Sequence, residues 1–109
     1  MIIAEFEKSA GNFVGFNISG HANYADYGKD IVCAAVSSAL QMVTNGLTEI
    51  LKLKCKIKED ENNIALKIMA NNKADNLKSG YAFIESFYLH LKLLAKTYKR
   101  TIKVIILEV

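Results

Sequence analysis

The chain has 109 residues, a formal net charge of +3 at pH 7 and no proline. A chain of this length forms one domain and buries roughly 65% of its unfolded surface, so it needs no disulfide or metal to hold a core. Its basic residues are scattered among acids, whereas a nucleic-acid-binding domain usually gathers positive charge on one face. We therefore expect a single domain over residues 1–109 that does not bind nucleic acid directly.

Nothing at the N-terminus resembles a signal peptide, because residues 1–4 carry no basic segment. No apolar run is expected to approach membrane-spanning length. The two cysteines, Cys33 and Cys55, are far apart and do not suggest a disulfide framework. These features predict a cytoplasmic protein with reduced thiols and no membrane contact.

The N-terminal residues predict a β-hairpin. Residues Ile2 to Lys8 alternate, with apolar side chains on one face, and a second alternating segment that ends at Ser19 follows a turn at residues 10–12. The residues expected to face inward are Ile2, Ala4, Phe6, Val14, Phe16 and Ile18.

A helix is predicted from Ile31 onward, where apolar residues recur at helical spacing. Asp30 stands where an N-cap residue would, and Cys33 falls in the first turn, close to unpaired backbone N–H groups. The apolar stripe comprises Val32, Val36, Ala39, Leu40, Val43, Leu47, Ile50 and Leu51.

A second hairpin is predicted around a turn at residues 60–63, and its first strand places Cys55 inward as an inert core residue. Residues 73–99 form the longest periodic segment and predict a second helix. Gly80 within it either permits close packing or is tolerated although it weakens the helix locally. The apolar stripe of this helix is wider than one sheet face needs, which favours a homodimer over a deeply buried helix.

Residues 102–109 are apolar on both faces, as in a strand inside a sheet. The complete order is ββαββαβ. We therefore expect an α+β fold: a single two-layer domain with a mostly antiparallel sheet of about five strands and two helices.

The chemistry points to His21 and Cys33, which stand at the two ends of one polar loop. A cysteine attacks as the thiolate, and an adjacent imidazole or a helix N-terminus favours that form. We predict that Cys33 is a nucleophile, that His21 is its base, and that N–H groups at the helix start receive the oxyanion.

Three nearby positions leave alternatives open. Ser37 lies one turn after Cys33, where its hydroxyl either bonds the thiolate or substrate or bonds back to the Cys33 carbonyl. Asp30 either caps the helix or also orients His21. The loop that contains Tyr24 and Tyr27 is either a lid that closes on substrate, with its tyrosines against substrate aromatics, or an ordinary connection.

No metal or cofactor is predicted. His90 lies far down the second helix and is expected at the surface or an interface. A zinc site made from the two histidines and two cysteines lacks the short ligand spacing of structural zinc sites.

The segment Gly20-His21-Ala22, followed by a tyrosine- and glycine-bearing loop and then by residues 30–37 (Asp-Ile-Val-Cys-Ala-Ala-Val-Ser), closely resembles the ribosomal-processing cysteine protease Prp family. The resemblance covers the first third of the chain, and the rest agrees in length and element order. It implies a bacterial cytoplasmic endopeptidase that removes the N-terminal extension of large-subunit ribosomal protein twenty-seven. It also implies that Cys33 is the nucleophile and His21 the base, supported by Gly20, Asp30 and Ser37.

Two other classes of function remain as alternatives. An exposed reactive thiol is also what an oxidant modifies, so a redox sensor is one, although Cys55 would have to leave its strand to resolve it. A non-enzymatic ribosome-associated adaptor is the other, for which His21 and Cys33 would be incidental.

Overall fold

The structure is a computed structural model that describes residues 1–20 and 27–109, without the side chains of residues 27–30. Its strands and α-helices, in chain order, are β1 (Ile2–Ser9), β2 (Asn12–Ser19), α1 (Tyr27–Asn45), β3 (Cys55–Asp60), β4 (Asn63–Ile68), α2 (Ala74–Thr97) and β5 (Ile102–Glu108).

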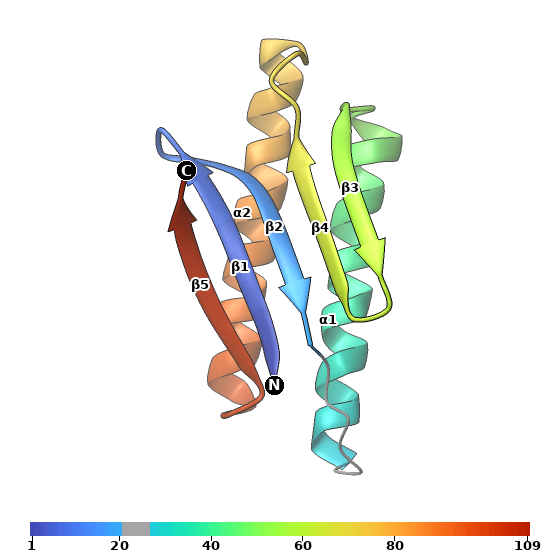
Figure 1. Cartoon of the computed structure of the whole chain (residues 1–109), viewed down its shortest axis with the longest axis vertical. Coiled ribbons are helices and arrows are strands. Elements are labelled where there is room, and N and C mark those ends of the chain that lie inside the picture. Colours follow the sequence, from blue (N-terminus) through green and yellow to red (C-terminus); the bar gives the residue numbers. More distant parts are fainter. Residues whose placement is uncertain (21–26) are drawn as a thin grey trace.

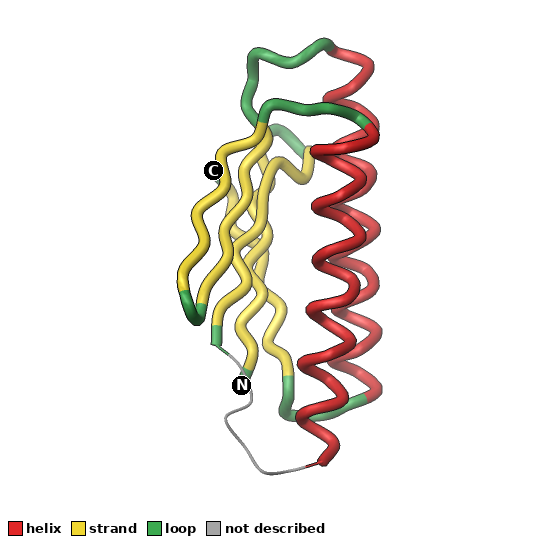
Figure 2. The backbone as a smooth tube through the Cα atoms, turned by 90° about the vertical axis from the view of Figure 1, so that its right-hand side faces the viewer, coloured by secondary structure: helices red, strands yellow, loops and turns green. Residues whose placement is uncertain are grey.

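The described strands form one five-stranded sheet in the order β3-β4-β2-β1-β5. Both helices cover the same face of this sheet, so the molecule has two layers (Figure 1, Figure 2). Neighbouring strands are antiparallel except β1 and β5, which are parallel. The predicted α+β class and the order ββαββαβ are confirmed.

The β1–β2 hairpin differs from the prediction at one core position. The inward residues predicted for β1 are all buried. A register shift between Glu7 and Lys8 pairs Lys8 with Phe13, as a β-bulge does. Phe13 is therefore buried and Val14 is only half-buried, so the prediction of Val14 as a core residue is wrong.

Helix α1 begins at Tyr27, before the predicted start at Ile31. Apolar periodicity marks only the part of a helix that packs on a core, so the polar first turn gave no signal. Cys33 consequently lies in the second turn of α1, and the prediction that it lies in the first turn is wrong.

The end of α1 departs from regular helical spacing. The helix continues into a π-helical turn over Gly46–Ile50, in which Leu47 is fully buried. Because a π turn holds more residues than an α turn, it rotates the positions that follow. Ile50 is 76% exposed, so its assignment to the buried stripe is wrong.

The second hairpin is confirmed, with Asp60 paired to Asn63 across a two-residue turn. Cys55, at the start of β3, is half-buried and packs against the core. This agrees with its predicted inward position.

Helix α2 packs on the centre of the sheet through Phe87. Its ring centroid lies 5.6 Å from that of Phe6 on β1 and 5.2 Å from that of Phe16 on β2, both in edge-to-face geometry. All three rings are buried, and each contributes roughly 1.5–3 kcal/mol through burial of apolar surface.

Gly80 on α2 permits close packing, the first of its two predicted readings. A Cβ atom there would lie 2.6 Å from Cδ1 of Leu53 and 3.0 Å from Cδ1 of Ile68. Gly80 is itself buried. A side chain at this position would require the side chains of Leu53 and Ile68 to shift.

Strand β5 lies at an edge of the sheet beside β1, not inside it. Ile106 and Leu107 are 39% and 40% exposed. The prediction of an interior strand is therefore wrong. Apolar residues on both faces do not distinguish an interior strand from an edge strand whose outer face is left partly open.

The prediction that no apolar run approaches membrane-spanning length is also wrong, because one helical segment is long and apolar enough to pass that test. Residues Ile31–Ile50 form a 20-residue helical segment with a mean hydropathy of 1.3. Core helices of water-soluble proteins pass the same test, and this segment packs Val32, Val36 and Val43 into the core.

Candidate active site

A cavity of about 260 Å³ opens at one end of the sheet, between α1 and the strands. One wall is the face of α1 that carries Cys33, Val36, Ser37 and Leu40. The opposite walls are the ends of β1 and β2, with Ile2, Ile18 and Gly20, and the β3–β4 turn with residues 59–64. The cavity therefore combines a thiol with apolar and polar walls.

Cys33 is half-buried, and its side chain lies where the core meets the cavity. Ser37 is exposed one turn later and lines the same cavity. Residues four apart in a helix share one face. A substrate in the cavity would therefore meet both the thiol and the hydroxyl.

The predicted oxyanion site at the start of α1 does not fit this geometry. The orphan N–H groups of an α-helix belong to its first four residues, here residues 27–30, whereas the amide of Cys33 lies within the helical ladder. The influence of the helix dipole also falls off beyond the first turn. We therefore withdraw the helix start as the oxyanion donor to a carbonyl attacked by Cys33.

The remaining predicted site residues lie partly outside the described structure. His21 and Tyr24 fall among residues 21–26, which are not described. Tyr27 and Asp30 lie on the backbone of α1, so Asp30 is the fourth residue of the helix and is not its N-cap. Their side chains are not described.

Gly20 connects the described cavity to His21, the next residue. Its φ of +73° is one that glycine adopts without strain, and a Cβ there would lie 2.6 Å from the carbonyl oxygen of Met1. Gly20 lines the same cavity as Cys33. The fold thus brings Gly20, the residue before His21, and the predicted nucleophile to one cavity.

The β3–β4 turn is the part of the site that the sequence analysis missed. Residues Glu59, Asp60 and Glu61 line the cavity. The backbone N–H of Gly20 donates to the carbonyl of Asn62 over 3.0 Å, which extends the β2–β4 ladder past Ser19. The acidic run is visible in the sequence, but only the pairing of β2 with β4 brings it to Cys33.

Cys55 contrasts with Cys33. Desolvation by burial raises the pKa of the Cys55 thiol above its ordinary value, and Cys55 is absent from the lining of the Cys33 cavity. Both cysteines lie in the described part of the chain and form no disulfide with each other. A half-buried thiol whose pKa is raised is poorly suited to resolve an oxidised partner, which argues against the redox-sensor alternative.

His90 is exposed on α2 and lines an apolar groove between the two helices. This agrees with its predicted surface or interface position. Within residues 1–20 and 27–109, no group of three or more His, Cys, Asp or Glu side chains is placed to hold a metal ion.

A thiol and a hydroxyl on one wall of an open cavity, with Gly20 on the opposite wall, form the kind of site that a thiol-dependent hydrolase uses. The sequence matches the family described as cysteine protease Prp over residues 1–103. The chain belongs to this family and is a cysteine protease, which confirms the resemblance found in the sequence.

Solved structures agree with this assignment. SMU.848 from Streptococcus mutans is 27% identical, with a TM-score of 0.87 over 100% of this chain and 99% of that chain. The ribosomal processing protease Prp from S. aureus, in complex with a substrate peptide, is 19% identical, with a TM-score of 0.84 over 98% of this chain and 100% of that chain. The same S. aureus protease with a covalently linked product peptide is 20% identical, with a TM-score of 0.82 over 98% and 100%. At these identities the S. aureus structures show the shared fold. No curated protein sequence matches the chain.

Proposed function

We propose that this protease removes the N-terminal extension of bacterial large-subunit ribosomal protein twenty-seven, with Cys33 as nucleophile and His21 as base. The observation that carries the proposal is that Cys33 and Gly20, the residue before His21, line one cavity. The S. aureus relative described as a ribosomal processing protease shares the fold and binds peptides, which supports a substrate of this class.

The proposed mechanism follows from the chemistry of the Cys33 thiol and the His21 imidazole. His21 accepts the proton of Cys33, and the thiolate sulfur attacks the scissile carbonyl carbon to give a tetrahedral intermediate. The C–N bond breaks as His21 donates that proton to the leaving amine, which leaves a thioester on Cys33. His21 then takes a proton from water, the hydroxide adds to the thioester, and the thiol is released with its proton.

The cavity gives this mechanism a place for an extended peptide. Ser37 supplies a hydroxyl one turn from the sulfur, and Ile2, Ile18 and Leu40 supply apolar contacts. Tyr24 and Tyr27 belong to the segment between His21 and Cys33, and we assign them to substrate contact in the proposal. Asp30 and Gly20 act in support of His21.

The first prediction is selective cleavage of a peptide that spans the extension. We expect mass spectrometry to show cleavage at one bond by the wild-type protein and a loss of at least about a thousandfold in Cys33→Ser or His21→Ala, since each removes a member of the dyad. An intact peptide with the thiol shown to be reduced would contradict the substrate assignment. Cleavage that persists in Cys33→Ser would contradict the choice of nucleophile.

We further propose that the protein is a homodimer in the cytoplasm, without direct contact to nucleic acid. Large apolar side chains on the outer side of the helical layer support the dimer. Leu89 and Leu93 on α2 are 56% and 59% exposed, and Met42 on α1 is 71% exposed. Apolar area of this kind on a helix layer is typical of a surface that packs against a second copy.

A further inference from the structure

We propose that the outer edge of β3 is a docking site for an extended acidic segment of a partner protein, which pairs with β3 as an additional strand. Neither the substrate nor the catalytic thiol takes part in this docking, and none of the lysines involved lines the Cys33 cavity. Three features of β3 point to the site: the free edge of its backbone, the lysines of its outer face and an exposed isoleucine of its inner face.

The backbone of β3 offers a hydrogen-bonding edge. In the described part of the chain, β3 is an outermost strand of the sheet and pairs only with β4. The carbonyl of Lys54 accepts the N–H of Met69 over 2.9 Å, and bonded residues alternate along an antiparallel ladder. The N–H and C=O groups of Cys55, Ile57 and Glu59 therefore point to the free side. Because these groups repeat at the spacing of an extended backbone, an added strand matches them.

The start of this edge is held in place by the side chain of Asn72. Its Oδ1 accepts the N–H of Lys54 over 2.8 Å, and its Nδ2 donates to the Lys54 carbonyl over 3.0 Å. The same Nδ2 donates to the carbonyl of Met69 over 2.6 Å. Asn72 thus joins the residue before β3 to the residue after β4. An edge that is ordered before a partner arrives lowers the entropic cost of docking.

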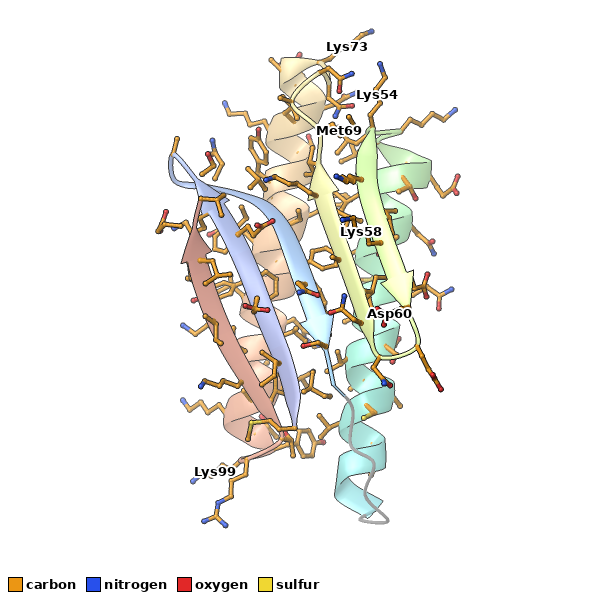
Figure 3. The ribbon with its side chains drawn as sticks, in the orientation of Figure 1. Lys54, Lys58, Asp60, Met69, Lys73 and Lys99 are labelled. Carbon is orange, nitrogen blue, oxygen red and sulfur yellow. The ribbon has the colours of Figure 1, made fainter. Side chains whose placement is uncertain are left out.

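The outer face of β3 carries a row of lysines. Lys54, Lys56 and Lys58 occupy alternate positions, so they share one face and stand about 7 Å apart along the strand. Cys55 lies between them on the opposite face and packs against the core, so the lysines face away from the helices. Figure 3 shows Lys54 and Lys58 along β3, and all three lysines are exposed. Within residues 1–20 and 27–109, none of their side chains forms an ion pair.

Positive charge is concentrated further by the neighbouring strand. Lys56 pairs directly with Lys67 of β4, which is also exposed. Like charges that face each other across two strands are destabilising, and an acidic side chain on the other side of Lys56 would offset the repulsion. The free edge is the side from which such a residue can approach.

The lysine row selects the charge of the added strand. Side chains of neighbouring strands stand opposite one another with the same repeat, so acidic residues at alternate positions would each meet one lysine. A second copy of β3 would bring lysines beside lysines, which is a common way in which edge strands avoid self-association. The edge therefore disfavours its own copy and matches an acidic segment. Asp60 ends the row on the same face, and its repulsion of an opposing acid would limit the register.

The inner face of β3 gives the residues between the acids their character. Ile57 is 43% exposed, although it lies on the face that Cys55 turns toward the core. A strand added at the edge would place an apolar side chain opposite Ile57 and cover part of this surface. The matching segment thus alternates acidic with apolar or β-branched residues.

The test measures binding of a labelled peptide to the wild-type full chain by fluorescence anisotropy at physiological ionic strength. The probe has glutamate at alternate positions, with valine and threonine between them. We expect a Kd below about 1 mM. Binding should be at least about fivefold tighter than that of a peptide with the same composition and consecutive glutamates. A peptide with lysine in place of glutamate should not bind measurably.

Charge reversal on the protein tests the lysine row. Lys56→Glu combined with Lys58→Glu should weaken binding of the acidic peptide at least about tenfold, because two attractive pairs become repulsive. The same variant should gain binding of the lysine peptide, which also shows that its edge is intact. Lys99→Glu combined with Lys103→Glu is the matched control at exposed positions away from β3. It should change binding less than about twofold, because salt screens distant charges.

Methylation of the peptide backbone separates strand addition from a general attraction of charges. In an added strand, alternate N–H groups face β3 and the others face away from it. One peptide is methylated at the nitrogens of its glutamates and another at the nitrogens of the residues between them. We expect one of the two to bind at least about tenfold more weakly and the other to bind as the unmethylated peptide does. This comparison uses only the wild-type protein.

Four results would overturn the inference. Equal binding of the alternating and consecutive peptides, or equal binding of the two methylated peptides, would exclude strand addition. No measurable binding of the acidic peptide would leave the lysines with the sole role of preventing self-association. A single-stranded oligonucleotide that binds more tightly than the acidic peptide, and loses binding when Lys56 and Lys58 are reversed, would assign the row to phosphate groups. Peptide cleavage by Cys33 is measured separately, so failure of the proposed substrate leaves each of these outcomes readable.

Discussion

At the scale of single residues, the fold gives the two cysteines different surroundings. Cys33 lines an open cavity, whereas Cys55 lies against the core, where desolvation raises the pKa of its thiol. The sequence predicts Cys33 as a nucleophile and Cys55 as an inert core residue. The structure places Cys33 at a cavity and agrees with the inward position of Cys55.

This difference predicts selective alkylation. At neutral pH we expect iodoacetamide to modify Cys33 at least about tenfold faster than Cys55, because only the thiolate reacts and burial holds Cys55 in the thiol form. The pKa of Cys55 is raised, so its modification should increase only as the pH rises past the ordinary thiol range. Peptide mapping over a pH series measures both sites, and equal rates at neutral pH would contradict the assignment.

Gly20 gives a second prediction at this scale. Gly20→Ala places a side chain at φ +73° and within 2.6 Å of the Met1 carbonyl, so we expect a loss of about 2–3 kcal/mol in the free energy of unfolding. Gly11→Ala is the matched control, because Gly11 has φ +82° and nothing within 4 Å. It should lose only about 1 kcal/mol. Equal losses in urea denaturation would show that the contact with Met1 does not matter.

At the scale of elements, the site depends on how strands and helices meet at one end of the sheet. Helix α1 supplies Cys33 and Ser37, the end of β2 supplies Gly20, and the β3–β4 turn supplies Asp60. The contact between α2 and the centre of the sheet, in which Phe87 packs edge-to-face on Phe6 and Phe16, joins the two layers.

Phe87 therefore provides a prediction about the packing of α2 on the sheet. Phe87→Ala should lower the free energy of unfolding by about 3–5 kcal/mol, because it leaves a cavity between α2 and the sheet. Glu85→Ala on the same helix is exposed and should change it by no more than about 0.5 kcal/mol. Chemical denaturation measures both variants. A loss below about 1 kcal/mol in Phe87→Ala would mean that the aromatic contact does not anchor the helix.

At the scale of the whole molecule, the two-layer architecture leaves the outer side of the helices without a covering layer (Figure 2). Leu89 and Leu93 lie there, and a groove of about 470 Å³ between α1 and α2 contains Met42 and His90. A second copy packed on this side would cover these apolar side chains.

The dimer proposal predicts a clear effect of charge on that surface. Leu89→Glu combined with Leu93→Glu should convert a dimer into a monomer in sedimentation experiments, because a dimer would bury both carboxylates without partners. Lys103→Glu, on an exposed position of β5, is the matched change of charge away from the helices and should leave the mass unchanged. A monomeric wild-type protein at micromolar concentration would contradict the proposal.

The sequence by itself determined the element order, the α+β class and the family resemblance. Alternation and helical spacing are local patterns that survive without knowledge of the partner elements, and the motif around Cys33 is continuous in the chain. The tertiary structure decided what depends on partners. The bulge replaced Val14 by Phe13 in the core, α1 began before Ile31, and the pairing of β2 with β4 brought Asn62 beside Gly20. Such positions are fixed by register and packing between distant segments, and single-sequence periodicity contains no information about either.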